Sequence, residues 1–532
     1  MNTRRQLKKT MKKFALLSLP LLVASCGLLG GPEEKTRALH TEATLTRFDS
    51  QKLETRAGKS ALFSKDAEPE YITVSPDGKT AYVSLQESNA LAVLDIASGE
   101  FTAVRPLGFK DWSKSALDAS DRDGADKKGR INIQAWPVLG AYMPDSIASY
   151  SVNGQTYILS ANEGDGREYE GFGDEVRVKD LKLDSAAFPN ATELQKDAAL
   201  GRLTVSRVDA DTDGDGDADR LVTFGGRSLS VWKAAGGLVS DTGDLFERTV
   251  AAQRPSTFNS EGTAETFDTR SDNKGPEPEA LTVAQLGGRH FAYVGLERTG
   301  GIMVLDVSNP AQPALVQYFN DIDASAVAKD GAAGDLAPEG LLFIPAASSP
   351  SGQPLLVSSN EVSGSVSLYT VASDGRLTRA GRYQAAPFQF EEGVAEISAY
   401  DPATKRLFTV NGATGGLDML DISNVSAPRL VGSVDLSRYG SGANSVAAYG
   451  GVVAVAVQAK TKTDAGSVVL LDAMGKELAQ PVQVGALPDM LTFTPDGKTI
   501  LVANEGEPNA DYSVDPAGSV SIIDVKQALA RR

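Results

Sequence analysis

The sequence predicts an all-β protein, and within that class a β-propeller with seven blades, six or eight being the alternatives. Three observations predict this fold. A short strand motif recurs seven times, a second apolar strand precedes each copy, and 52 Gly and 25 Pro supply many turns. Small antiparallel sheets cannot each bury a core alone, whereas radial closure buries their faces and protects their edges. Residues 61–532 are therefore expected to form a single propeller.

The N-terminal segment is typical of an export signal. A basic stretch precedes an apolar run, residues 14–24, which is too short to span a bilayer and is flanked as in a secretory signal. Residues 1–25 are predicted to be a lipoprotein signal peptide, because the sequence VASC, ending at Cys26, resembles the bacterial lipobox. The alternative is plain cleavage beside an incidental cysteine, and Met11 is an alternative start.

Lipidation of Cys26 would attach the chain to a membrane, since several acyl chains on one residue give stable anchoring. Gly27, rather than an acidic residue, follows the cysteine, which by resemblance to other lipoproteins points to the outer membrane. Residues 26–60 are polar with little periodicity and are expected to form the lipid anchor and a tether. The chain is therefore expected to be exported and lipid-anchored in the cell envelope, at the outer membrane or the cell surface.

Each predicted blade contains three strands that can be read from the sequence. The third strand usually ends in Asp, as in residues 90–96, 301–307, 416–422, 467–473 and 519–525. The strand before it is apolar, and the innermost strand opens with a Pro-acid pair or a variant of that pair. Hairpin sequences such as PDGK connect the first two strands. The last blade lacks a fourth strand, which residues 41–49 are expected to supply, closing the ring.

The spacing between blades is uneven, and the first two blades carry the excess in two insertions, residues 108–132 and 163–228. Long insertions on a rigid scaffold often carry function. In the second insertion, Asp165, Arg167 and Glu168 have no full counterpart in the other blades. We expect these three residues to take part in any activity special to this face of the propeller.

The composition excludes several classes of function. The net charge of −17 disfavours binding to nucleic acid, because so acidic a surface repels phosphate. The chain has only two His and one Cys, which excludes a His-rich zinc site and a CxxC redox pair. A Ser–His–Asp triad would need His290, which follows a Gly-Gly hairpin signal and is expected to be an exposed turn residue. Any chemistry must therefore use carboxylates, Arg or Lys, hydroxyl groups and hard metal ions.

Two series of acidic residues recur at equivalent positions of the repeat. The first opens the innermost strands: Glu70, Asp145, Glu279, Glu339, Glu396 and Asp489. The second ends the next strands: Glu87, Glu163, Glu297, Glu361 and Glu505. Antiparallel neighbours place both series at one mouth of the channel, where the carboxylates would repel each other unless cations lie among them. Oxygen ligands in this density suit Ca²⁺ or Mg²⁺, and the alternative is that each acid caps its own blade turn.

The acidic loop 209–221 is a second candidate metal site. Its acids occupy alternate positions, and a glycine follows the third of them, as in the first half of an EF-hand-type Ca²⁺ loop. They are Asp211, Asp213, Asp215, Asp217 and Asp219. Val222 occupies the place of the bidentate Glu, so the last ligand would come from elsewhere, and the alternative is a solvated acidic loop. Asp118, Asp121 and Asp123 form a weaker candidate of the same kind.

Several long strings resemble the choice-of-anchor I family, among them ASDRDG, ANEGDGREY, RSDNKGPEPEAL and GLERTGGIMVLDVSNP. The resemblance extends over most of residues 65–530. It implies a protein held at the cell surface by interchangeable anchors, and some bacterial members are labelled alkaline phosphatase. The family is also similar to the mesenchyme-specific cell-surface glycoproteins of animals. No general activity follows from the resemblance.

Three functions are compatible with these residues, and the first two belong to different classes. The first is a lipid-anchored propeller that binds Ca²⁺ and a small-molecule or protein ligand at its acidic face, with no nucleic acid among its partners. The alternative is a Ca²⁺-dependent phosphoesterase similar to the propeller phytases, and a lactonase-like propeller with one channel metal is a third reading. In the phosphoesterase, the metal ligands or the base would come from Glu163, Asp165, Glu277, Glu279, Glu297, Glu339 and Glu361. Phosphate charge would be met by Arg167, Arg270, Lys274 and Arg298.

Overall fold

The computed structural model describes residues 38–56, 58, 62–169 and 171–531. The expected signal peptide, residues 1–25, and the expected lipidation site Cys26 lie outside the described residues. Among the described helices, none combines the length and apolarity needed to cross a membrane.

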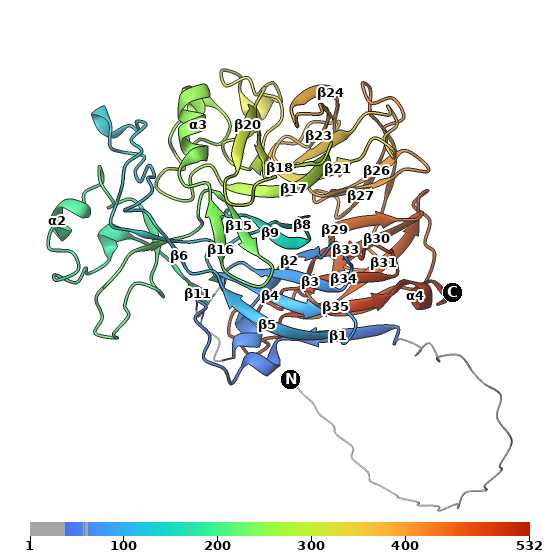
Figure 1. The fold of residues 1–532 in the computed structure, drawn as a ribbon, viewed down its shortest axis with the longest axis horizontal. Coiled ribbons are helices and arrows are strands. Elements are labelled where there is room, and N and C mark those ends of the chain that lie inside the picture. The colour runs from blue at the N-terminus through green and yellow to red at the C-terminus, as the bar shows by residue number, and fades with distance from the viewer. Residues whose placement is uncertain (1–37, 57, 59–61, 170, 532) are drawn as a thin grey trace, which may run out of the picture. The chain divides into compact units, whose positions relative to one another are not determined.

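The described chain is built around seven antiparallel sheets of four strands each, and its fold is a β-propeller (Figure 1). From the innermost strand outward, blade 1 consists of β2 (Pro69–Val74), β3 (Thr80–Leu85), β4 (Ala90–Asp95) and β5 (Glu100–Pro106). Blade 2 consists of β8 (Ile147–Val152), β9 (Gln155–Ala161), β15 (Leu229–Lys233) and β16 (Leu238–Asp241). Blade 3 consists of β17 (Pro278–Leu286), β18 (Arg289–Leu296), β19 (Ile302–Asp306) and β20 (Ala314–Phe319).

Blade 4 consists of β21 (Pro338–Ile344), β22 (Leu355–Asn360), β23 (Ser365–Val371) and β24 (Leu377–Gln384). Blade 5 consists of β25 (Ser398–Asp401), β26 (Arg406–Asn411), β27 (Gly416–Asp421) and β28 (Arg429–Val434). Blade 6 consists of β29 (Gly442–Tyr449), β30 (Val452–Gln458), β31 (Ala465–Asp472) and β32 (Val482–Ala486). The last blade consists of β33 (Pro488–Phe493), β34 (Thr499–Asn504), β35 (Ser519–Asp524) and β1 (His40–Thr44).

The innermost strands form a ring around the central channel. Each contacts the innermost strand of the next sheet, in the order β2, β8, β17, β21, β25, β29 and β33, and β33 contacts β2 again. Equivalent positions of the repeat therefore face a common axis. This arrangement places the recurring acidic residues on one circle.

The last sheet takes its outermost strand from the N-terminal part of the chain. The sequence predicts this strand within residues 41–49, and β1 pairs with β35 from His40 opposite Ile523 to Thr44 opposite Ser519. The short 3₁₀ helix η1 (Thr46–Phe48) follows and buries Phe48. The structure thus differs from the tether expected over residues 26–60, because from residue 38 onward the chain packs against the propeller.

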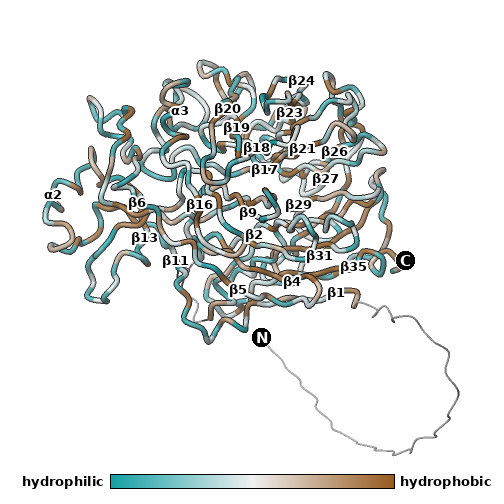
Figure 2. Tube along the Cα trace, in the orientation of Figure 1, coloured by the Kyte–Doolittle hydropathy of each residue, from teal (hydrophilic) through white to brown (hydrophobic). Residues whose placement is uncertain are grey.

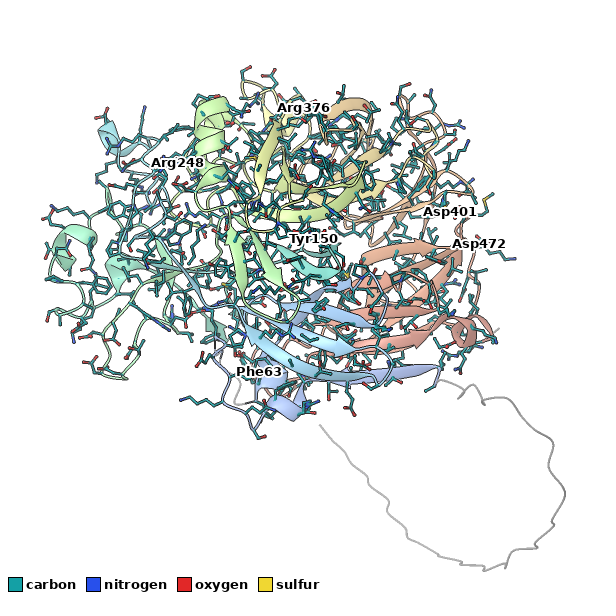
Figure 3. The ribbon with its side chains drawn as sticks, viewed as in Figure 1. Phe63, Tyr150, Arg248, Arg376, Asp401 and Asp472 are labelled. Carbon is teal, nitrogen blue, oxygen red and sulfur yellow. The ribbon has the colours of Figure 1, made fainter. Side chains whose placement is uncertain are left out.

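The middle strands are apolar because each sheet is covered by a neighbour on both faces. β30 reads VVAVAVQ, a run of β-branched and small residues whose central five positions are buried. Figure 2 shows hydrophobic residues along the strands, including β4, β31 and β35. Side chains fill the spaces between the ribbons (Figure 3), and the Tyr150 hydroxyl donates a hydrogen bond to the Val307 carbonyl at 3.1 Å. His290, expected as an exposed turn residue, lies half-buried in β18 with its ring 5.3 Å from that of Tyr150.

The two predicted insertions fold together into a lobe with its own core. Its strands are β6 (Phe109–Asp111), β7 (Leu139–Ala141), β10 (Glu168–Tyr169), β11 (Phe172–Gly173), β12 (Glu175–Arg177), β13 (Thr204–Ser206) and β14 (Val222–Thr223). Its helices are η2 (Ala125–Lys127), η3 (Val178–Asp180) and α2 (Ala191–Leu194). Trp112 and Leu117 from the first insertion pack with Val178, Leu203 and Leu221 from the second. Figure 1 shows α2 and β6 in this lobe, to one side of the seven sheets.

A third long segment, residues 242–277, joins β16 to β17 and is not identified by the repeat spacing. It contains α3 (Leu245–Gln253), η4 (Pro255–Thr257) and η5 (Ala264–Thr266). Two short helices, α1 (Phe63–Asp66) and α4 (Val525–Leu529), and the 3₁₀ helix η6 (Ala328–Asp330) complete the described elements. The segment 242–277 delivers Lys274 and Glu277 to the mouth of the channel.

Candidate metal centre

The strand openers position their acids through a recurring irregularity of the ladder. In β17, Pro278 lies opposite Leu296, and the register shifts between Pro278 and Leu281. The same shift follows Pro69, Pro338 and Pro488. Proline lacks the N–H that a regular ladder needs, and a bulge re-aims the side chain beside it. The side chain of the acid after each proline therefore departs from the regular alternation of side chains between the two faces of the sheet.

Six carboxylates meet at the mouth beside blades 2, 3 and 4, and we call them the mouth cluster: Asp145, Glu163, Glu277, Glu279, Glu297 and Glu339. Glu279 belongs to two groups of three in which the carboxylate oxygens lie within 4.8 Å of one another. One group contains Asp145 and Glu163, and the other contains Glu297 and Glu339. A third group joins Glu163, Glu277 and Glu297.

Burial and mutual repulsion dominate the electrostatics of the mouth cluster. Burial, together with the charges of Glu297 and Glu339, raises the pKa of Glu279 well above its usual range. Burial and the neighbouring acids have the same effect on the pKa values of Asp145 and Glu339. The pKa of Glu297 is raised to about 7 by burial and by Glu277. These carboxylates are therefore destabilised as anions unless a cation is bound among them.

Glu279 gives the clearest sign of a missing partner. The residue is 8% exposed, and its Oε2 atom has no hydrogen-bond partner among the described residues. Glu70 and Glu87, further round the same mouth, also have a buried Oε2 atom without a described partner. Buried polar atoms are nearly always satisfied, so an orphaned carboxylate oxygen in an acidic cluster fits a cation ligand. The all-oxygen donor set suits Ca²⁺ or Mg²⁺.

Three basic side chains partly neutralise the negative charge at one edge of the mouth cluster. Lys274 Nζ lies 2.6 Å from Glu163 Oε1 and 3.5 Å from Glu277 Oε2. Arg270 donates to Glu277 through Nε at 2.8 Å, and Arg298 Nη2 lies 2.8 Å from Glu297. Although burial alone would raise it, these cations lower the pKa of Glu277. The charge that remains uncompensated is centred on the Glu279 side.

Two cavities adjoin the mouth cluster. One, of about 540 Å³, is lined by Glu297 and Arg298 together with apolar groups that include Val327 and Phe390. The other, of about 440 Å³, lies between the innermost strands and includes Glu339 in its lining. The first cavity offers a ligand an apolar wall, a cation and a carboxylate of the cluster. Asp165, whose side chain is 52% exposed, lies 3.7 Å from Lys274 Nζ at the same edge.

Arg167 has a different environment from the one the sequence predicts. Its side chain is 0% exposed, with Nε 3.3 Å from an Asp66 oxygen. It donates to the backbone carbonyls of Asp66 and Glu87 at 3.0 and 2.9 Å. These bonds tie the second insertion to blade 1 and leave the guanidinium no access to a phosphate. Glu361 acts electrostatically on Glu339 but belongs to none of the three groups of the mouth cluster.

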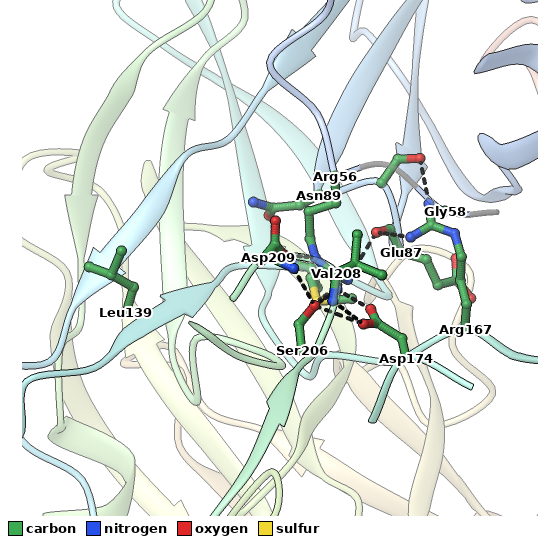
Figure 4. A network of polar contacts seen from close by, with 12 residues as sticks. Arg56, Gly58, Glu87, Asn89, Leu139, Arg167, Asp174, Ser206, Val208 and Asp209 are labelled. Carbon is green, nitrogen blue, oxygen red and sulfur yellow. Dashed lines mark hydrogen bonds and ion pairs between the residues drawn. The ribbon is translucent and has the colours of Figure 1, made fainter. Parts of the chain in front are cut away.

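A buried arginine network beside the mouth is not predicted by any sequence motif (Figure 4). Arg56 donates to Asp209 at 2.5 Å and to Ser206 Oγ at 2.9 Å, and it also pairs with Asp174. Arg56 lies in the segment expected to be a tether, whereas its partners lie in the second insertion. The N-terminal segment is thus held by buried charge on the insertion lobe.

The acidic loop 209–221 is exposed over residues 212–216, and only part of it forms a group. Asp211, Asp213 and Asp219 place carboxylate oxygens within 4.8 Å of one another. Asp211 accepts hydrogen bonds from the backbone N–H groups of Gly214 and Gly216 at 2.6 and 3.0 Å. Asp217 instead pairs with Lys182 at 2.9 Å, and Asp215 accepts from the Asp217 N–H at 3.0 Å.

Comparison with known proteins gives one matching family. The model of the choice-of-anchor I domain matches residues 33–310 and 396–530. The chain is 36% identical over 190 residues to gigasin-3a of Magallana gigas, a match that covers 34% of this chain and 66% of gigasin-3a. It is 30% identical over 305 residues to the mesenchyme-specific cell surface glycoprotein of Strongylocentrotus purpuratus, covering 49% of this chain and 38% of the glycoprotein. The matched region is less than two thirds of either relative's length.

Solved propellers are similar to this structure at low sequence identity. The β-propeller domain of Cps50 (Swd1) from Myceliophteria thermophila has a TM-score of 0.43 at 8% identity, covering 89% of this chain and 98% of that one. The Dos1 propeller has a TM-score of 0.42 at 10% identity, covering 86% of this chain and 92% of that one.

Proposed function

Since this chain belongs to the choice-of-anchor I domain family, we propose that it is an exported, surface-held β-propeller that holds Ca²⁺ in its mouth cluster and binds a ligand or partner there. The observation that carries the proposal is Glu279, a buried carboxylate placed between two groups of acids with one oxygen unpartnered. Within the acid-rich half of the cluster, a divalent cation supplies the charge that the protein's own basic residues do not.

The location follows from the family and from the N-terminal segment. A relative is named a cell surface glycoprotein, which supports a place at the surface for this chain as well. The lipobox-like sequence ending at Cys26 supports attachment through lipid in the cell envelope. Metabolic labelling with a palmitate analogue tests this part, with label expected on the native chain and none on the Cys26→Ser variant.

The ligand site is the 540 Å³ cavity beside Glu297 and Arg298. Bound Ca²⁺ would attract an anionic group, Arg298 would pair with that group, and Val327 and Phe390 would cover an apolar portion of the ligand. Arg298 is positioned for this role because its side chain is 35% exposed and is oriented by Glu297. The ligand class that fits is a small molecule or peptide carrying a carboxylate or phosphate.

Phosphoester hydrolysis is the second candidate, favoured by the proximity of Lys274 and Arg298 to the mouth cluster. Ca²⁺ would bind phosphate and lower the pKa of a bound water, and a carboxylate of the cluster would accept its proton. Assays of the protein lacking residues 1–26 on a panel of phosphoesters, with and without Ca²⁺, test this candidate. Absence of turnover at millimolar Ca²⁺ would eliminate hydrolysis and leave the binding function.

Calorimetric titration of the metal-stripped protein tests the Ca²⁺ centre. We expect Glu279→Gln to weaken Ca²⁺ binding at the mouth by at least about tenfold, because the amide keeps the shape but removes a charged ligand. In chelator the same variant should melt close to the native protein, since the raised pKa of Glu279 already favours its neutral form. Glu100→Gln, an exposed acid on β5, is the matched control. Equal Ca²⁺ affinity in both variants would refute the centre.

The acidic loop adds a second expected Ca²⁺ position, with Asp211, Asp213 and Asp219 as its ligands. Its contribution is separable in the same titration. Asp213→Asn should reduce the number of bound ions without altering the mouth affinity, because Asp213 is exposed and lies in the insertion lobe.

A further inference from the structure

A second buried acidic cluster lies where the first insertion meets the segment before blade 3. We call it the junction cluster, and it consists of Asp118, Asp123, Glu247, Asn259 and Asp268. The charges of Glu247 and Asp123 act on Asp118, and those of Asp118, Asp123 and Asp121 act on Asp268. No mouth carboxylate is among the charges that act most on these two acids.

The acids of the junction cluster are removed from solvent. Asp118 and Asp268 are 0% exposed and Glu247 is 1% exposed. The Asp123 side chain is also 0% exposed. Fully buried carboxylates are rare unless each is paired or bound to a cation.

The hydrogen bonds of the cluster leave three buried oxygens without a donor. Asp268 accepts from Ser271 Oγ through Oδ1, but its Oδ2 has no partner among the described residues. Glu247 accepts from Arg227 and from Asn259 through Oε1, and its Oε2 is likewise unpartnered. Asn259 Oδ1 is the third such atom. Three acceptors of this kind in one cluster indicate an absent electropositive ligand.

The charge balance leads to the same conclusion. In the described part of the chain, the four carboxylates pair with two guanidinium groups, Arg227 at 2.8 Å from Glu247 and Arg130 at 3.2 Å from Asp123. Lys110, whose charge also acts on Glu247, is already paired with Asp241 at 3.0 Å. Two negative charges therefore remain uncompensated when all four acids are ionised, which is the charge of one divalent cation.

We propose that the junction cluster is a structural Ca²⁺ site in which Asp118, Asp268 and the Asn259 side-chain carbonyl are the principal ligands. All its donors are oxygens, which suits a hard cation. Burial and the neighbouring acids raise the pKa of Asp118 to about 7 and that of Asp268 to about 9, as expected where a cation is missing. The site is independent of the proposed mouth centre.

The site would fasten the first insertion to the scaffold. Asp118 Oδ2 accepts from the Asn132 N–H at 2.5 Å, which closes the loop between these residues. The same loop folds tightly over Asp268, because a Cβ at Gly129 would lie 2.0 Å from Asp268 Oδ2. A cation held by Asp118 and Asp268 would therefore bridge the loop to the segment that leads into β17.

Limited proteolysis tests the site, because Lys127, Lys128 and Arg130 are exposed on this loop and are trypsin targets. In the metal-stripped native protein, Ca²⁺ should slow cleavage at these three positions by at least about tenfold. Asp268→Asn should abolish that protection. Asp126→Asn, an exposed acid of the same loop, should keep it, and Glu279→Gln should also keep it because the mouth is separate.

The alternative is that Asp118 and Asp268 share a proton in place of a cation. Native protein would then be cleaved at the same rate in Ca²⁺, in Mg²⁺ and in chelator, which overturns the proposal. Protection that survives in both Asp118→Asn and Asp268→Asn overturns it as well. If Asp268→Asn does not fold by circular dichroism, the native protein and Asp118→Asn decide the question alone. Equal Ca²⁺ affinity of Glu279→Gln and Glu100→Gln, with Ca²⁺ still protecting the loop, would refute the mouth centre without affecting this one.

Discussion

At the scale of single residues, the mouth face uses its buried cations in two ways. Lys274 contacts acids of the mouth cluster and adjusts their charge, with Glu163 2.6 Å from its Nζ. Arg167 lies apart, where Asp66 and the carbonyls of Asp66 and Glu87 use its hydrogen-bonding groups. The acids around Arg167 raise its pKa despite burial, so the group stays charged. Lys274 is thus suited to tuning a site and Arg167 to holding two segments together.

Arg167→Met is therefore expected to destabilise the fold. The substitution leaves Asp66 without its buried partner, and breaking such a pair costs about 3–5 kcal/mol. Arg376→Met is the matched control, since Arg376 is 55% exposed and pairs only with the exposed Asp374. Urea unfolding followed by tryptophan fluorescence measures both. Equal midpoints for the two variants would contradict the structural role of Arg167.

At the scale of elements, the strand β1 is held by more than its ladder. Glu42 accepts hydrogen bonds from Ser521 Oγ at 2.6 Å and from Asn504 Nδ2 at 3.2 Å, and also from Ser519. Although burial alone would raise it, the hydrogen bonds from His40, Ser519 and Ser521 lower the pKa of Glu42. A single carboxylate thus connects three strands of the last sheet.

Glu42→Ala should weaken this closure by about 1–3 kcal/mol, because it leaves buried hydroxyl groups without an acceptor. The stabilisation by a carboxylate with a lowered pKa is present above its unfolded pKa and is lost as the pH falls through its folded pKa. The variant and the native protein should therefore differ at neutral pH and converge in acid. Glu100→Ala, exposed on the outermost strand of blade 1, is the control for thermal melts.

The elements also show what the sequence can and cannot predict. The strands follow from a repeat in which apolar residues, Pro-acid openers and turn sequences recur, and the converging acids follow from antiparallel pairing of those strands. Within residues 242–277, the sequence indicates Arg270, Lys274 and Glu277 as candidate site residues, but helix α3 and buried Glu247 have no counterpart in the repeat and no such signal. The sequence also cannot predict that Arg56 pairs with Asp174 and Asp209, because 118 and 153 residues separate them along the chain.

At the scale of the whole molecule, buried acids with raised pKa values extend beyond the mouth cluster. Besides the mouth cluster, burial raises the pKa of Asp489 to about 7, and burial with Glu361 and Asp489 raises that of Glu396 to about 8. In the folded protein these groups bind protons at pH values where the unfolded chain has lost them. Protons and Ca²⁺ are therefore competitors for the same oxygens.

The metal-free protein should become less stable as the pH rises. Carboxyl groups with raised pKa values contribute stability that is full below about pH 4, the unfolded value, and is lost as the pH passes through about 7 to 8. Added Ca²⁺ should flatten this decline, because it replaces the lost protons as the compensating charge. Calorimetric melting at pH 5, 6, 7 and 8, in chelator and in Ca²⁺, measures the effect. A melting temperature that rises with pH in chelator would contradict the clustered-charge account.

The pairing of β1 with β35 also bears on how the molecule is made. His40 and Ile523 lie opposite each other, so the contact that completes the last sheet spans almost the whole described chain. Contacts of such long sequence separation form late and slowly. A polypeptide emerging from the ribosome cannot pair β1 with β35 until the residues of β35 have been synthesised. Under the export proposed above, that delay would keep the polypeptide open enough to pass through a translocon, and the ring would become complete only on the far side of the membrane.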